Sequence, residues 1–384
     1  MKRTPRVPKG IDLILEHFAE LPDPRIDRTR RHPLINVIVM SLCGAICGAD
    51  GWEALEMFAE TREAFFRSFL DLAGGTPSAD TFRRVLSALD PRAFEAAFGR
   101  WVQAFTGSLV GETVAVDGKT LRGALAHASE GGPFHMVHVW ATSKHILLGL
   151  RAVAGAPGEV AAVIEMLQTL ALNGAVVTAD ANSCTAAVTE TCRAAGADYV
   201  LALKGNRGTL HRQVKQVFAQ AESKGFRGVD RFASHDEAHG RIEHRIVRAL
   251  PIDKVPLTSQ APWADLHSVI QVERTRVVKE RMSVERFYYI SSMAAKAEDF
   301  SRRIRGHWSI ENQLHHCLDV SFDEDQRTIR DPIGAQNFAL ISRYALVLLK
   351  RETSRKMSVA MRRRRAAWEH EYLLQVLVAG TIAV

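Results

Sequence analysis

The order of hydrophobic patterns between residues 112 and 205 constrains the fold more than any other feature of the chain. Three short apolar runs follow one another closely, at 113–117, 134–143 and 145–153, and this spacing predicts an antiparallel meander. Strands and helices then alternate, which predicts parallel βαβ units. These segments are a helix at 158–172, a strand at 175–180, a helix at 184–195 and a strand at 199–205. The pattern therefore predicts an α/β fold around a mixed five-stranded sheet.

The rest of the chain divides into helical and β-rich stretches. Residues 10–107, 206–226 and 296–350 have helical periodicity, whereas 227–292 alternates between apolar and polar residues with prolines between the runs. We therefore expect four parts: an all-α N-terminal domain at 1–107, an α/β core at 108–226 and 293–352, a β-rich insertion at 227–292, and a basic helical tail at 353–384.

Basic residues outnumber acidic ones, with 50 Lys and Arg against 43 Asp and Glu and a net charge of +7. A hydrophobic content of 47% is typical of globular proteins and excludes a disordered chain. Arginines crowd residues 25–31 and form an unbroken run from Arg362 to Arg365. Such runs are often solvated faces, but together with the net charge they favour a polyanionic partner, above all nucleic acid.

The cysteines and the apolar segments bear on the compartment. Five cysteines without a CxxC pair do not fit a disulfide framework, which favours a reducing cytosol. No apolar signal-peptide core follows the basic start. Residues 33–49 are uncharged over 17 positions, but they contain Asn36 and Ser41 and predict a buried helix rather than a membrane span. We expect a cytoplasmic protein with no membrane partner.

A basic helix follows a Gly-rich turn in the N-terminal region. Ser78 or Asp80 can cap the segment ADTFRRVLSAL, which carries Arg83 and Arg84 beside an apolar stripe. A short helix, a turn and a basic helix resemble a helix-turn-helix that contacts DNA. Helical pairs of this kind also occur as plain packing units, so both interpretations stay open.

Two predicted strands end in the same way, with an acid before a turn. Asp117 ends VAVD and Asp180 ends VVTAD. Aspartate is a common turn residue, so either position alone has a purely structural explanation. If the first and fourth strands are neighbours, however, the two carboxylates face each other and repel unless a cation lies between them. A divalent metal ion would satisfy that requirement.

A third acid is offered by Glu311 in HWSIENQLHHCLD. On a helix, His307 and His315 lie one turn either side of it, and most of the shared face is apolar. An ion pair with Arg303 or Arg305 is the alternative explanation, and Asp319 is a rival ligand.

Hard oxygen ligands suit Mg²⁺ or Mn²⁺, and two such ions can support in-line phosphoryl transfer. Lys119, Arg122 and Lys204 follow the predicted strands and are candidates for binding phosphates, although a lysine in a surface turn needs no such role.

Several blocks of sequence occur in a characteristic order. They are ETVAVDGKTLRGA, VVTADANSCT, ADYVLALKGNRGTLH, HGRIEHR, ERFYYISS and IRGHWSIENQLHHCLDVSFDED. The series closely resembles bacterial insertion-sequence transposases of the DDE class, in the subgroup that includes the H-repeat-associated proteins. The stretch FAELPDPRIDRTRRHPLINVIVMSLCGAICGADGWE is similar to the N-terminal associated domain of that family.

The resemblance implies a ribonuclease-H-like catalytic core of the retroviral-integrase superfamily, with the β-rich insertion between the second Asp and the Glu. It implies that Asp117, Asp180 and Glu311 bind the catalytic metals. The implied activity is cleavage of double-stranded DNA at the element's terminal inverted repeats and transfer of the 3′-hydroxyl into target DNA, by a homodimer on paired ends. A nuclease without strand transfer and an inactive DNA-binding relic are the alternatives.

The chain departs from the family pattern around the Glu. Related transposases often carry Tyr, Arg and Lys in the spacing Y-x2-R-x3-E-x6-K, where this chain has Ile304, His307 and Leu318. We expect Arg305, His307 and His315 to make the phosphate contacts instead. The segment DANSC also differs from the expected DAMGC but keeps the carboxylate of Asp180.

Overall fold

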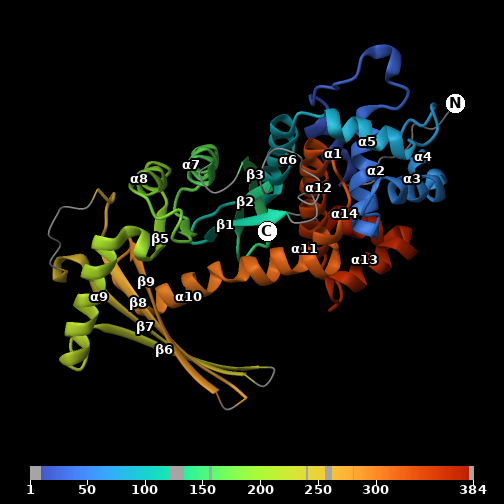
Figure 1. The fold of residues 1–384 in the computed structure, drawn as a ribbon. Coiled ribbons are helices and arrows are strands. Elements are labelled where there is room, and N and C mark those ends of the chain that lie inside the picture. The colour runs from blue at the N-terminus through green and yellow to red at the C-terminus, as the bar shows by residue number, and fades with distance from the viewer. Residues whose placement is uncertain are drawn as a thin grey trace.

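The computed structural model describes residues 10–121, 134–154, 158–238, 241–255, 262–279 and 281–379. It is a mixed α/β structure with one large sheet and a helical N-terminal region (Figure 1). The strands are β1 (Thr113–Leu121), β2 (Phe134–Ala141), β3 (Ile146–Ala154), β4 (Val176–Ala179), β5 (Asp198–Leu203), β6 (Asp230–Ala238), β7 (Arg241–Pro251), β8 (Ser268–Val278) and β9 (Arg281–Ser291).

The first five strands pair as the hydrophobic pattern predicts. β1, β2 and β3 form an antiparallel meander, and β4 and β5 add to the other side of β1 in parallel. The spatial order β3-β2-β1-β4-β5 puts β1 and β4 side by side. Their adjacency is the condition on which the two strand-end aspartates were expected to meet.

The predicted extent of the sheet is wrong, because within the described residues the sheet has nine strands and not five. β9 pairs antiparallel with β5, from Val200 opposite Ser291 to Leu203 opposite Tyr288, and β8, β7 and β6 follow in order. Periodicity identifies a strand but not its pairing partner, so the pairing of the insertion with the core could not be predicted from sequence.

The insertion strands are buried only where they lie next to the core. On β9, the four residues from Tyr288 to Ser291 are buried, whereas Arg281–Arg286 are exposed. The far ends of β6–β9 project from the body as a ribbon (Figure 1).

Helices from both sides of the insertion cover the sheet. They are α7 (Glu159–Thr169), α8 (Ala186–Ala194), α9 (Gly208–Ser223), α10 (Ala297–His307) and α11 (His316–Ser321). On α10, Ala297, Phe300 and Ile304 form a separate apolar core with residues of β4, β5, β7, β8 and β9. This packing fixes α10 across the junction between the first five strands and the insertion, and α10 runs on toward α11 (Figure 1).

The remaining helices form one packed assembly. They are α1 (Ile11–Phe18), α2 (Leu34–Cys47), α3 (Trp52–Thr61), α4 (Glu63–Arg67), α5 (Ala79–Ala88), α6 (Pro91–Thr106), α12 (Pro332–Arg351), α13 (Val359–Trp368) and α14 (His370–Ala379). α12 packs against α2, α5, α6 and β3, so the C-terminal helices and the N-terminal region share a core with the sheet (Figure 1). The domain boundaries stay a prediction, since packing alone does not define independently folding units.

The uncharged stretch at 33–49 forms α2, whose residues are buried except at Ile35 and Cys47. The prediction of a buried helix is therefore confirmed. In the part of the chain that the structure describes, no single helix is long and apolar enough to cross a membrane, and only α2 with α3, bent by 97°, passes such a test as a pair.

The basic helix α5 and the C-terminal arginine run both form ion pairs within the protein. Ser78 caps α5 as predicted, and Arg83 and Arg84 both pair with Asp80 while staying about half or more exposed. DNA contact by this helix stays a prediction. Within the C-terminal run, Arg363 binds Asp50 and Arg365 binds Glu369. The run is therefore not the continuous free basic surface that its sequence suggests.

Candidate active site

The register between β1 and β4 brings two of the predicted acids together. Val116 is paired with Ala179, so Asp117 and Asp180 are the next residues on two neighbouring parallel strands. The chain leaves β1 for β2 on one side and β4 for β5 on the other, which makes this end of the sheet a topological switch point. Ligands of open α/β sheets gather at such points.

The third acid lies on a distorted turn of helix. Glu311 begins η6 (Glu311–His315), a π-helical turn in which the His316 N–H donates to the Glu311 carbonyl. A plain helix was predicted here, and the π turn was missed because apolar spacing does not resolve a single widened turn. Such turns occur often at functional sites. α10 ends shortly before this turn and α11 follows it directly.

Three side chains form a tight donor group at this point. Ligand atoms of Asp117, Glu311 and His315 all lie within 4.8 Å of one another. The His315 Nδ1 is 3.6 Å from Asp117 Oδ2 and 3.4 Å from Glu311 Oε2, and the ring is buried. Asp180 lines the same cavity of about 470 Å³ as Asp117 and Glu311. The structure thus brings all three predicted acids to one cavity and adds a histidine between two of them.

The electrostatics of the group are those of a site that attracts cations. Burial and the charges of Glu311 and Asp180 raise the pKa of Asp117 from 3.8 to about 7. A hydrogen bond from His315 is the main reason that the pKa of Glu311 is lowered. Carboxylate oxygens are the ligands that Mg²⁺ and Mn²⁺ prefer, and the buried His315 Nε2 has no hydrogen-bond partner among the residues that the structure describes. The residues present therefore fit a divalent metal ion.

Asp180 is also a turn residue. Its Oδ1 accepts the backbone N–H groups of Asn182 and Ser183, at 3.0 and 3.2 Å. The structural explanation for a strand-end aspartate therefore holds here, and the functional one stays a prediction. The turn orients the carboxylate, and its second oxygen is the one that a ligand in the cavity can use.

His307 lies beside Asp180 as a neutral ring. Its Nδ1 is 3.1 Å from Thr178 Oγ1 on β4, and it lines the same cavity. Burial lowers the pKa of His307 from 6.5 to about 4. A neutral imidazole can donate a hydrogen bond to a phosphate but brings no positive charge, so His307 does not replace the arginine of the family pattern as a cation.

The predicted phosphate-binding side chains separate into different environments. Lys204 is exposed and lines the cavity of the three acids. Arg305 makes two hydrogen bonds to Asp236 of β6, at 2.6 and 3.0 Å, and so joins α10 to the insertion. Arg122 lies outside the described residues. Of these three, Lys204 is the cation that the structure brings to the acids.

Lys119 has a different environment from the expected surface turn. β1 does not end at Asp117 but continues to Leu121, and Lys119 is 9% exposed. Its Nζ pairs with Asp319, lies 3.5 Å from Glu324 Oε2 and donates to the His315 carbonyl at 3.4 Å. The Lys119 ammonium is therefore bound by groups of the protein itself, and one of these groups is Asp319, the rival metal ligand.

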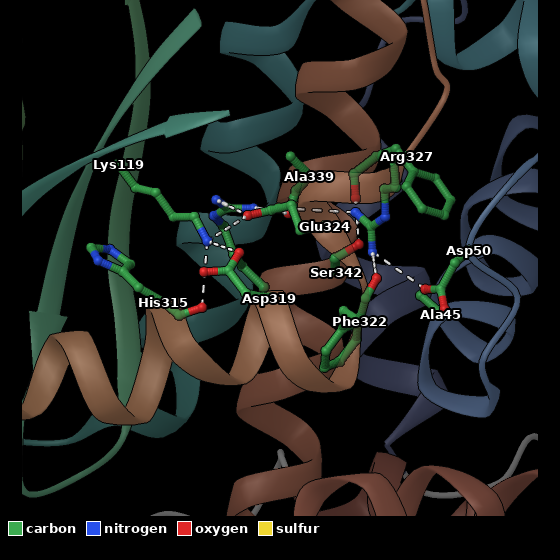
Figure 2. A network of polar contacts seen from close by, with 12 residues as sticks. Ala45, Asp50, Lys119, His315, Asp319, Phe322, Glu324, Arg327, Ala339 and Ser342 are labelled. Atoms are coloured by element: carbon green, nitrogen blue, oxygen red, sulfur yellow. Dashed lines mark hydrogen bonds and ion pairs between the residues drawn. The ribbon is translucent and has the colours of Figure 1, made fainter. Parts of the chain in front are cut away.

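A buried ionic network behind the site was missed entirely. Arg343 of α12 is fully buried, binds both oxygens of Glu324, and donates from Nε to His138 Nε2 at 2.8 Å. Glu324 in turn faces Lys119, as Figure 2 shows. One signal was available: Arg343 interrupts the apolar run FALISRYALVLL, and an arginine within such a run needs a buried partner.

Comparison with known proteins agrees with this geometry. A family model described as "Transposase DDE domain" matches residues 109–348, more than half of the chain, and one described as "DDE_Tnp_1-associated" matches residues 15–102. The chain belongs to the DDE transposase family.

Individual relatives match along nearly the whole chain of this transposase. "Putative transposase YncI" of Escherichia coli O157:H7 is 32% identical over 96% of this chain and 95% of its own length. "H repeat-associated putative transposase YhhI" of Escherichia coli K12 is 31% identical over 96% of this chain and 99% of its own length. A shorter match, 36% identical over 19% of this chain, is to "Inactive transposase YbfQ" of the same strain. The predicted membership of the H-repeat-associated subgroup is confirmed.

Proposed function

We propose that this protein is an active transposase that cleaves DNA at the ends of its element and joins the 3′-hydroxyl to target DNA. The observation that carries the proposal is the convergence of Asp117, Asp180 and Glu311 on one cavity at the switch point of the sheet. The strand order β3-β2-β1-β4-β5, with β1 and β4 adjacent and parallel, supports a ribonuclease-H-like core.

In this proposal the three acids hold divalent metal ions, Mg²⁺ or Mn²⁺ and two in number. When bound, such ions activate the attacking oxygen and stabilise the leaving one in phosphoryl transfer. Asp117 and Glu311 supply carboxylate oxygens that His315 holds at fixed separation. Asp180 is oriented by its turn, and Lys204 binds a phosphate at the wall of the cavity.

The substrate in this proposal is double-stranded DNA, both the terminal inverted repeats of the element and the target. The net charge of +7 and the exposed Lys204, Arg83 and Arg84 support a polyanionic partner. We further propose that two copies of the chain act together on paired ends.

The test uses the purified full chain, Mg²⁺ and a DNA fragment bearing the inverted repeats that flank the gene. The expected products are cleaved ends and, with target DNA present, joined ends. Asp117→Asn, Asp180→Asn and Glu311→Gln should each abolish both products while DNA binding in a gel-shift assay persists. Cleavage without any joined product would favour a nuclease. DNA binding by the wild-type chain without either product would indicate that this protein is catalytically inactive. One relative carries the word inactive in its name.

A further inference from the structure

The strand that carries Asp117 and the helix that carries Glu311 are attached at two points. At the first, His315 lies against the carboxylate of Asp117. At the second, Lys119 pairs with Asp319, four residues further along the helix. Two residues along a strand advance about 6.6 Å, and four along a helix about 6 Å. The spacings match, so both contacts form in one register of the strand against the helix and neither survives a shift.

Lys119 can bridge the two elements because its side chain lies on the same side of β1 as that of Asp117. Residues two apart on a strand face the same way. The Nζ of Lys119 also donates to the His315 carbonyl, so a single ammonium holds both the start and the end of the helical turn that follows Glu311. Figure 2 shows Lys119 between His315, Asp319 and Glu324.

The position of Lys119 is in turn determined by buried charges. Glu324 faces Lys119 with one oxygen and binds Arg343 with both. Arg343 is fully buried, and its remaining N–H groups donate to His138 and to the Ala339 carbonyl. A guanidinium held by this many partners on a central helix is a rigid support.

Arg343 is also connected to the site through His138. His138 lies opposite Asp117 in the pairing of β2 with β1. Its Nε2 accepts from Arg343, which fixes the orientation of the ring, and the ring centre is 4.9 Å from that of His315. Arg343 therefore supports His315 through His138 and supports β1 through Glu324 and Lys119.

We propose that Lys119, Glu324 and Arg343 are positioning residues that fix the register of β1 against the Glu311-bearing helix, and thereby the separation of the acids that bind metal. This inference rests on the proposed function of the acids. Loss of a residue that orients metal ligands typically weakens metal binding by 10- to 100-fold. None of the three side chains needs to touch the metal for this effect.

The experiment measures Mn²⁺ binding to the full-length protein by electron paramagnetic resonance titration, without DNA, together with the urea midpoint of each variant. Glu324→Gln and Lys119→Gln should each weaken Mn²⁺ binding by about tenfold or more. Their double variant should be no weaker than the worse single one, since both act through the same contact. Lys119→Gln keeps the test usable if Glu324→Gln does not fold.

The matched control is Glu112→Gln. Glu112 is another buried glutamate, directly before β1, and it accepts hydrogen bonds from Ser143 and Thr142 away from the acids. Glu112→Gln should lower the stability of the fold but leave its Mn²⁺ affinity within about twofold of the wild type. If destabilisation by itself weakened metal binding, Glu112→Gln would lose affinity as well. Equal weakening by Glu112→Gln and Glu324→Gln, or wild-type affinity in Glu324→Gln and Lys119→Gln, would overturn the inference.

Failure of the proposed function gives a different result. If Asp117→Asn binds Mn²⁺ as tightly as the wild type, the acids do not form the metal site, and both proposals are wrong. If Asp117→Asn loses binding while Glu324→Gln and Lys119→Gln keep it, only the positioning role is wrong.

Discussion

Replacing Glu324 with glutamine should destabilise the fold in a pH-dependent way. Burial alone would raise the pKa of this carboxyl, but the charges of Arg343 and Arg327 outweigh it and lower the pKa from 4.5 to about 2. A shift of this size corresponds to about 3 kcal/mol of stability at neutral pH. Removing one partner of a buried ion pair is known to cost about 3–5 kcal/mol, which agrees.

The sign of the pH dependence follows from the direction of the shift. Because the folded-state pKa of Glu324 lies below its unfolded value, the stabilisation is complete above about pH 4.5 and is lost as the pH falls toward 2. The free-energy difference between wild type and Glu324→Gln should therefore be about 3 kcal/mol at pH 7 and about 1 kcal/mol smaller at pH 3.5.

The assay is urea unfolding at both pH values, followed by tryptophan fluorescence, to which the buried Trp101 and Trp140 contribute. Glu369→Gln is the matched control, because Glu369 pairs with Arg365 at 2.9 Å but is 52% exposed. Exposed pairs of this kind contribute about 0.5 kcal/mol. A cost below about 1 kcal/mol for Glu324→Gln, or an equal cost at both pH values, would refute the account of Glu324 as a buried, compensated anion.

Three further predictions test other parts of the structure. Lys204→Ala should weaken DNA binding and reduce its salt dependence by about one unit of slope, measured by fluorescence anisotropy across salt concentrations. Ser78→Ala should cost about 1 kcal/mol in urea unfolding, because the Ser78 hydroxyl accepts the Thr81 N–H at the start of α5. Gly44→Leu should lower the melting temperature strongly in calorimetry, since even a Cβ at Gly44 would lie 2.5 Å from the Leu55 side chain.

Much of the α/β core could be predicted because each of its strands can be recognised from its own apolar residues. Two of the candidate acids could be found from a local pattern, because Asp117 and Asp180 each end an apolar run. Neighbouring parallel strands with matched ends then required the two carboxylates to meet, and the pairing of Val116 with Ala179 confirms the adjacency. Glu311 followed from a different argument, a lone acid on a largely apolar helical face.

Other features could not be predicted because they depend on contacts between distant segments. Gly118 suggested that β1 ends in a turn, yet it lies inside the strand, where a Cβ would be 2.1 Å from His135 Nε2. The glycine therefore makes room for a side chain of β2, and the strand continues through Lys119. With the strand ended too early, Lys119 was placed at the surface and its pairing with Asp319 was invisible.

The buried ionic network behind the acids also makes distant parts of the fold depend on one another. Buried charges are costly unless every partner is present. Glu324 is satisfied by Arg343 of α12 and Lys119 of β1, whereas Asp50, between α2 and α3, is satisfied by Arg327 and by Arg363 of α13. The two acids are linked through Arg327, which lies 3.9 Å from Glu324 and 3.3 Å from Asp50 (Figure 2). Because these groups come from both ends of the chain, the charges are compensated together only when the helical assembly is packed against the sheet, and the register that sets Asp117 against the Glu311 helix depends on the same contacts.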